Sequence, residues 1–183
     1  PFGWQTVGVS VGGEALPLTA PNGRAASPTR YEYELGSVVE VYDVRLEGLK
    51  QSFVLRTRPG SGELRIEGQL ETKLRTTPGM HGHHDLSFVD EAGHPIVGYG
   101  KAIAFDANGR RWPVSTEVAN DRITLSLAAE AVASAAYPLV VDPLLTNTVL
   151  ATYSTFSAWG EARAVDIARD DENNQLMVAY QRD

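Results

Sequence analysis

Hydrophobic and polar residues alternate along most of this chain with a period of two residues. In the clearest run, 64–74, leucine, isoleucine and threonine occupy every second position, and charged or amide residues lie between them. Because successive side chains of a β-strand point to opposite faces, this run predicts a strand with one buried and one solvated face. Gly68 falls on the buried face, where a glycine indicates a β-bulge or a close approach to the backbone.

The same alternation predicts further strands, and turn-forming residues separate them. The strand patterns cover 42–46, 53–57, 112–118 and 123–127, and less clearly 96–105, 137–141, 148–156, 164–168 and 175–180. The turns are Pro59–Gly62, Asp90–Gly93, Asp106–Gly109 and Ala119–Asp121, and Asp106–Gly109 is typical of a type I′ turn. Strands joined by short turns at this spacing predict an all-β fold, an antiparallel β-sandwich.

Two segments depart from this pattern. The alanine-rich stretch 127–136, ended by Pro138, predicts a helix of one or two turns. Glycine and proline interrupt residues 1–30, which we expect to form an N-terminal arm with one edge strand that contains Trp4, Val7, Val9 and Val11. The sandwich domain is then expected over 31–146.

Several pieces of sequence between about 31 and 143 occur in an order that resembles a known domain. They are GLKQSFVLRTRP (48–59), LSFVDEAGHPIVGYGKAIAFDANGRRWPV (86–114) and AAYPLVVDP (135–143). In this order they resemble the domain near the N-terminus of large secreted bacterial proteins, especially from myxobacteria, that carry FG-GAP, SBBP or other β-propeller-type repeats downstream. The resemblance implies an extracellular or cell-surface location and no particular catalytic residues.

Residues 147–183 are similar to the opening of a propeller blade. A blade needs about four strands, and this segment shows two or three strand patterns around a polar turn. A lone hairpin is marginal in water, and its open edges pair with whatever strand is available. We therefore expect the first strands of an incomplete propeller-like blade, completed by polypeptide beyond Asp183 or by a cleaved fragment that stays associated.

Composition removes several classes of function. The chain of 183 residues has no cysteine, which excludes disulfides, thiolate metal sites and a cysteine nucleophile. With 16 basic and 23 acidic residues its net charge is −7, which argues against nucleic-acid binding through phosphate neutralisation. No apolar run reaches the roughly 18 residues of a membrane span, and the sequence contains no HExxH or phosphate-binding loop motif.

The histidines are the only concentration of reactive side chains. On an extended segment His81 and His83 point the same way and Asp85 continues that face, so His81, His83, His84 and Asp85 are candidate ligands of a metal such as zinc. The stretch follows a Thr-Pro-Gly turn and is predicted to be a loop, so solvated histidines are the favoured interpretation. A metal-dependent enzyme built on the loop 81–94 is the least favoured function.

A second candidate metal site lies near residue 170. Asp170, Asp171, Glu172, Asn173 and Asn174 form a dense cluster of the oxygen ligands that calcium prefers, but their spacing is not that of an EF-hand and a solvated turn is favoured.

Exposed tryptophans could form a stacking platform for sugar rings, and Trp4, Trp112 and Trp159 are the candidates. Trp112 shares a predicted strand face with valines, which favours core packing. Glu32 and Glu34 are interpreted as surface charges rather than a catalytic carboxylate pair.

These features favour a non-enzymatic structural or interaction module of a secreted or cell-surface bacterial protein, acting in scaffolding, adhesion or assembly. Its expected partner is the rest of the same polypeptide or a cleaved fragment, with other surface proteins or glycans as further candidates. The alternatives are a carbohydrate- or calcium-binding module and the metal-dependent enzyme, which would need calcium or zinc.

Overall fold

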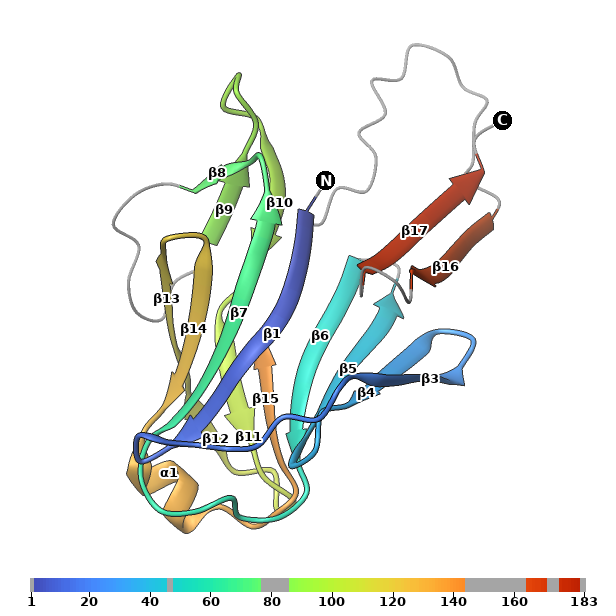
Figure 1. Ribbon diagram of the computed structural model, residues 1–183. Helices are drawn as coiled ribbons and strands as arrows, with labels where there is room; N and C mark the ends of the chain where they lie inside the picture. The colour runs from blue at the N-terminus through green and yellow to red at the C-terminus, as the bar shows by residue number, and fades with distance from the viewer. Residues whose placement is uncertain (1, 46–47, 77–85, 144–163, 171–174, 182–183) are drawn as a thin grey trace.

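The computed structural model describes residues 2–45, 48–76, 86–143, 164–170 and 175–181, the last two ranges as backbone only. Antiparallel sheets dominate these residues, and the two largest pack face to face around a shared core (Figure 1). The prediction of an all-β sandwich is confirmed. In these ranges no helix combines the length and apolar character that a membrane crossing requires.

The first large sheet has five strands in the order β13-β14-β7-β1-β2. They are β1 (Phe2–Val11), β2 (Glu14–Ala15), β7 (Leu64–Thr72), β13 (Ser115–Ala119) and β14 (Arg122–Leu127). A three-stranded sheet of order β10-β9-β8 follows β7 in the chain. It comprises β8 (Arg75–Thr76), β9 (Leu86–Val89) and β10 (Pro95–Tyr99).

The second large sheet has seven strands in the order β12-β11-β15-β6-β5-β4-β3. They are β3 (Asn22–Ser27), β4 (Arg30–Glu34), β5 (Val38–Arg45), β6 (Gly48–Leu55), β11 (Ala102–Phe105), β12 (Arg111–Pro113) and β15 (Leu139–Pro143). The predicted short helix is present as α1 (Ala129–Ser134) between β14 and β15. Ala131 and Val132 of α1 are buried in the core.

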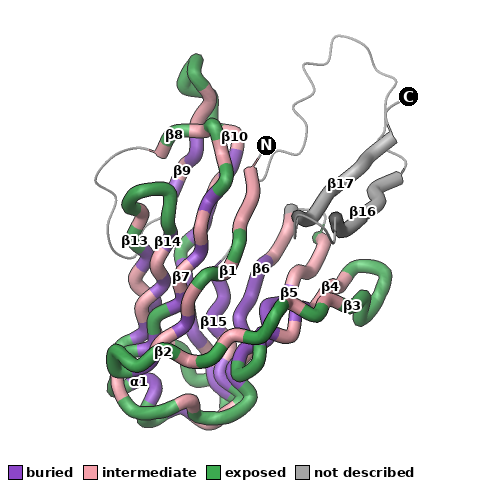
Figure 2. Tube along the Cα trace, viewed as in Figure 1, coloured by how far each residue is buried: buried purple, intermediate pink, exposed green. Residues whose placement is uncertain are grey.

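The core lies between the inner faces of the two large sheets (Figure 2). Strand β7 shows the predicted alternation, because Leu64, Ile66 and Leu70 are buried while Arg65 and Glu71 are exposed. The facing strands β6 and β15 contribute further buried side chains, including Phe53, Leu55, Leu139 and Val141.

Two runs predicted as single strands are divided between sheets. The run 112–118 forms the end of β12 in the seven-stranded sheet and β13 in the five-stranded sheet, with fully buried Val114 between them. The run 96–105 forms β10 and β11, which also belong to different sheets. The period-two pattern does not reveal where a segment passes from one sheet to another, because the inner faces of the sheets point into the same core.

Residues 1–30, predicted as an arm with one edge strand, contribute strands to both large sheets. Strand β1 pairs with β7 along most of its length, and β2 pairs with β1 only at Ser10 and Val11. Strand β3 pairs with β4 and ends the seven-stranded sheet.

The segment predicted to begin a propeller-like blade contains the antiparallel hairpin β16 (Ala164–Asp170) and β17 (Gln175–Gln181). A part of β17 lies close to β1, and the hairpin is drawn beside the upper ends of β5 and β6 in Figure 1. The propeller-like blade stays a prediction.

The turns follow their sequences with one exception. Asn120 and Asp121 have φ angles of 51° and 59°, as the type I′ turn between β13 and β14 requires. The type I′ prediction for Asp106–Gly109 is wrong, because within this turn only Gly109 has a positive φ, of 76°.

The side chain of Asp106 holds this turn instead, by accepting hydrogen bonds from the backbone. Its Oδ1 accepts from the backbone N–H of Asn108 and of Arg110, each at 2.9 Å, and its Oδ2 accepts from the N–H of Ala136 at 3.0 Å. These N–H groups, that of Ala136 above all, lower the pKa of Asp106. One carboxylate therefore ties the β11–β12 turn to the segment that follows α1.

Asp106→Ala is expected to lower the melting temperature by several degrees at neutral pH, because three backbone N–H groups lose their acceptor. A carboxylate with a lowered pKa stabilises the fold above its ordinary value of 3.8, and this contribution is lost as the pH falls through the folded value. The difference from wild type should therefore shrink in acid. Thermal melts followed by circular dichroism test this, with Asn108→Ala as control, and a difference independent of pH would contradict it.

Gly68 lies beneath the indole of Trp4, as its place on the buried face of β7 suggested. A Cβ at position 68 would approach the Trp4 ring to 2.0 Å. The indole cannot easily move away, because its centroid lies 6.1 Å from the stacked ring of Tyr99 and 6.2 Å from that of Phe53.

Gly68→Ala is expected to reduce the free energy of unfolding by about 1–3 kcal/mol, the usual cost of overpacking a core. The matched control is Gly8→Ala on the neighbouring strand, where a Cβ would meet nothing closer than 3.6 Å. Urea denaturation measures both variants. Equal stability of the two would show that the Trp4–Gly68 contact is not tight.

Candidate functional site

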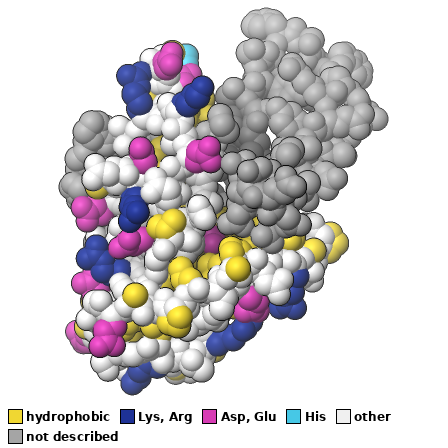
Figure 3. All heavy atoms as spheres, in the orientation of Figure 1, with side chains coloured by type: hydrophobic (Ala, Val, Ile, Leu, Met, Phe, Trp, Pro, Cys, Tyr) yellow, Lys and Arg dark blue, Asp and Glu magenta, His cyan; other side chains and the backbone are white. Residues whose placement is uncertain are grey.

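A small pocket opens between β1 and the β4–β5 part of the seven-stranded sheet. Its volume is about 40 Å³, and Trp4, Thr6, Tyr33, Glu40 and Tyr42 are among the residues that line it. A band of hydrophobic side chains runs across the face of the molecule on which β1 crosses in front of the seven-stranded sheet (Figure 3). The pocket therefore combines an acidic group with aromatic rings and polar side chains.

A β-bulge in β1 brings two of these residues to the pocket. Trp4 is paired with Leu70 and Thr6 with Gly68, but the register shifts between Thr6 and Gly8, so that Val9 is paired with Ile66. As a result Trp4 and Thr6 before the bulge and Val9 after it all lie on the inner face of the sheet. Val7, which the period-two pattern grouped with Val9, is instead 39% exposed.

Glu40 comes from the inner face of β5, where the register opposes it to Phe53 of β6. Its residue surface is only 5% exposed. The Tyr42 hydroxyl and the Gln51 Nε2 each donate to Glu40 Oε1 at 2.6 Å. The Thr6 hydroxyl donates to Oε2 at 2.8 Å and accepts from Trp4 Nε1 at 3.1 Å.

All of these donors to Glu40 are neutral. In the part of the chain that the structure describes, no lysine, arginine or histidine forms an ion pair with Glu40. Burial raises the pKa of Glu40, and the hydrogen bonds from Tyr42, Thr6 and Gln51 oppose that rise. Burial and the nearby Glu40 charge raise the pKa of Tyr42 well above 10, which keeps its hydroxyl a donor.

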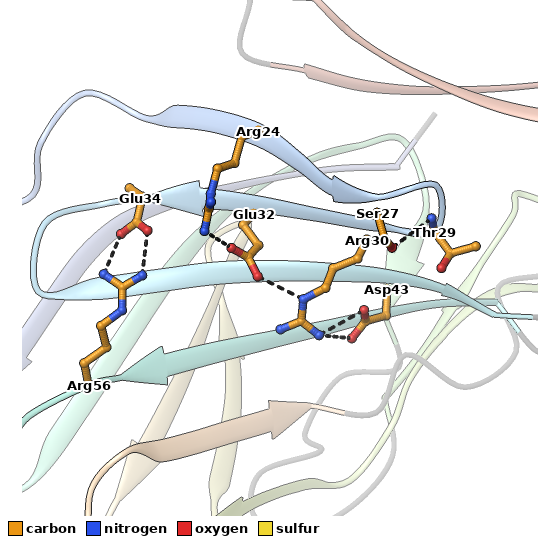
Figure 4. A network of polar contacts seen from close by, with 8 residues as sticks. All are labelled: Arg24, Ser27, Thr29, Arg30, Glu32, Glu34, Asp43 and Arg56. Carbon is orange, nitrogen blue, oxygen red and sulfur yellow. Dashed lines mark hydrogen bonds and ion pairs between the residues drawn. The ribbon is translucent and has the colours of Figure 1, made fainter.

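The outer face of β4 and β5 shows the opposite arrangement, with Glu32, Glu34 and Asp43 paired to arginines (Figure 4). Glu32 accepts from Arg24 at 2.7 Å and from Arg30 at 3.0 Å, and Arg30 also pairs with Asp43. This is the arrangement expected of the surface charges that the sequence suggested.

The ion pair between Arg56 and Glu34, at 2.6 Å, spans from the end of β6 to β4 (Figure 4). Because β5 lies between those strands, the pair crosses above it, where Val39 faces the same side and is 4% exposed. Long arginine side chains commonly cover apolar surface in this way.

The residues proposed from the sequence as metal ligands, His81, His83, His84 and Asp85, lie outside the described residues. His94, the last of the four histidines, closes the β9–β10 turn: its N–H donates to Asp90 Oδ1 at 2.8 Å, and its Nδ1 lies 3.2 Å from Oδ2. These contacts, the backbone one first, lower the pKa of Asp90. Among the residues that the structure describes, no three His, Cys, Asp or Glu side chains are grouped to hold a metal ion.

The calcium cluster predicted at 170–174 lies outside the described residues apart from Asp170, which ends β16. Trp159 also lies outside them. Trp112 is partly buried against the core, as the sequence favoured, and the Arg110 guanidinium lies 4.9 Å from its ring centroid. Trp4 packs on the core and lines the pocket rather than forming an open platform.

Reasoning from the sequence missed Glu40, Thr6 and Gln51. The signal for Glu40 is present in the pattern Val38, Glu40, Tyr42, in which an acidic residue occupies an apolar face of a strand. A scan of the chain against models of protein families, and searches of curated proteins and of solved structures, found no match.

Glu40→Gln is expected to become increasingly stable relative to wild type as the pH rises. A carboxyl whose pKa is raised in the folded state destabilises the fold as the pH climbs from its ordinary value of 4.5 through the folded value. The glutamine variant has the same shape and does not ionise. The facing hydroxyls of Tyr42 and Tyr99, with pKa values well above 10, stay protonated throughout.

Urea denaturation of both proteins across this pH range measures the effect, and Glu34→Gln controls for the removal of one negative charge. Parallel stability profiles of wild type and Glu40→Gln would contradict the expectation.

Proposed function

We propose that this chain is a non-enzymatic interaction module of a secreted or cell-surface bacterial protein, which packs against a downstream β-repeat region. Its role is structural, in scaffolding, adhesion or assembly. The sequence resemblance to domains that precede propeller-type repeats motivates the proposal. The observation that carries it is the position of the downstream hairpin, because a part of β17 lies close to β1.

The open edge of β1 supports this packing. Within the described residues β2 pairs only with the end of β1, at Ser10 and Val11, and no strand pairs with the remaining length on the side opposite β7. Unpaired strand edges and two-stranded hairpins both gain stability from further contacts. The β16–β17 hairpin, whose strands pair only with each other among the described residues, has the same need.

A cluster of tyrosines on the inner face of β4 and β5 offers a surface for such contacts. The ring centroids of Tyr31 and Tyr33 lie 5.0 Å apart, and those of Tyr33 and Tyr42 lie 5.9 Å apart. Tyr31 and Tyr42 are only half-buried. Tyrosine is enriched in protein interfaces because it combines a large apolar area with a polar tip.

A spin label tests whether the hairpin docks here in solution. The chain has no cysteine, so Val7→Cys provides a single attachment site on the exposed position of β1. The nitroxide should broaden the backbone amide signals of 175–181 in NMR spectra. Glu91→Cys, in the exposed β9–β10 turn, is the matched control and should leave them sharp. Equal signals with both labels would refute the proposed packing.

A further inference from the structure

We propose that the Glu40 pocket binds a primary ammonium group, with the Glu40 carboxylate as its counter-ion. The group would be the head of a lysine side chain or an amino terminus. This inference goes beyond the proposed function and does not depend on it, since the pocket is formed by residues of β1, β4, β5 and the segment between β3 and β2.

The first argument is charge. Glu40 is 5% exposed, and its hydrogen-bond partners Thr6, Tyr42 and Gln51 are neutral. A buried carboxylate is costly unless a positive charge accompanies it. Because no cation of the described chain occupies that place, a cation from outside would supply the missing charge.

The second argument is the remaining hydrogen-bonding capacity. Glu40 Oε1 accepts two hydrogen bonds, whereas Oε2 accepts one, from Thr6. A carboxylate oxygen has two acceptor sites, and the Trp4 indole N–H, which donates to Thr6, also interacts with this carboxylate, so an incoming donor would share it with that indole. An ammonium group carries three donors, and the pocket is lined by the hydroxyl oxygens of Thr6, beside Oε2, and of Tyr42, beside Oε1.

The third argument is size and lining. The pocket volume of about 40 Å³ is more than the roughly 10–15 Å³ that a cavity needs to hold one water molecule. It therefore has room for an ammonium head. Trp4, Tyr33 and Tyr42 line it, and aromatic rings attract cations. Calcium would need six to eight oxygen ligands, and this pocket supplies a single carboxylate.

NMR titration of the intact chain with n-butylammonium tests the proposal. The indole N–H signal of Trp4 is the probe, because Trp4 Nε1 donates to Thr6, which donates to Glu40. We expect a saturable shift with a Kd on the order of 1 mM. The neutral isostere n-butanol should shift the signal little, and tetramethylammonium, which has no N–H donors, should compete only weakly. An equal response to n-butanol, or no saturable shift with n-butylammonium, would overturn the proposal.

Variants assign the binding to Glu40. Glu40→Gln should weaken the response at least tenfold, while Glu34→Gln, on the outer face of the neighbouring strand, should leave it unchanged. Unaltered binding of n-butylammonium by a folded Glu40→Gln protein would overturn the assignment of binding to Glu40. If that variant does not fold, the comparison of n-butylammonium with n-butanol on the wild-type protein decides whether the pocket binds an ammonium group. A stronger response to Nα-acetyl-lysine amide than to glycinamide would support a lysine side chain as the ligand, and the reverse order would support an amino terminus.

Discussion

The bulge in β1 opposite Gly68 is the constraint on which both the core and the pocket depend. Without it, a strand of period two would place either Trp4 and Thr6 or Val9 and Val11 in the interior, but not both pairs. One extra residue lets β1 change phase, so its first half supplies an indole and a hydroxyl and its second half supplies core valines. The missing side chain at Gly68 leaves the space that the indole occupies.

Glu40 shows how a sandwich core can accept an acidic group at its margin. The two oxygens of the carboxylate are held by side chains from three strands, Thr6 of β1, Tyr42 of β5 and Gln51 of β6, so the two sheets are bridged by polar contacts as well as by apolar packing. The same burial that orders this network makes the ionised form costly. A residue that lines a pocket and lowers the stability of the fold is typical of a binding site.

Sequence reasoning predicted the elements of the fold better than their connections. The alternation in 64–74, the short helix and the turn at Asn120 are local signals, and the structure has them where the pattern indicates. The division of 112–118 between two sheets depends on the partner strands, which a single run of residues does not specify. Glu40 was overlooked for a related reason. An acidic residue within an apolar pattern is usually at the surface, and its true surroundings come from β1, more than thirty positions earlier in the chain.

The two edge strands of the seven-stranded sheet also affect whether this sheet can pair with a strand of another copy of the chain. Strand β12 is three residues long and finishes with Pro113, which has no amide hydrogen to offer to an incoming strand. At the opposite end, β3 carries exposed polar residues such as Arg24 and Ser27. Neither end of the seven-stranded sheet is therefore a good template for adding a strand from another copy.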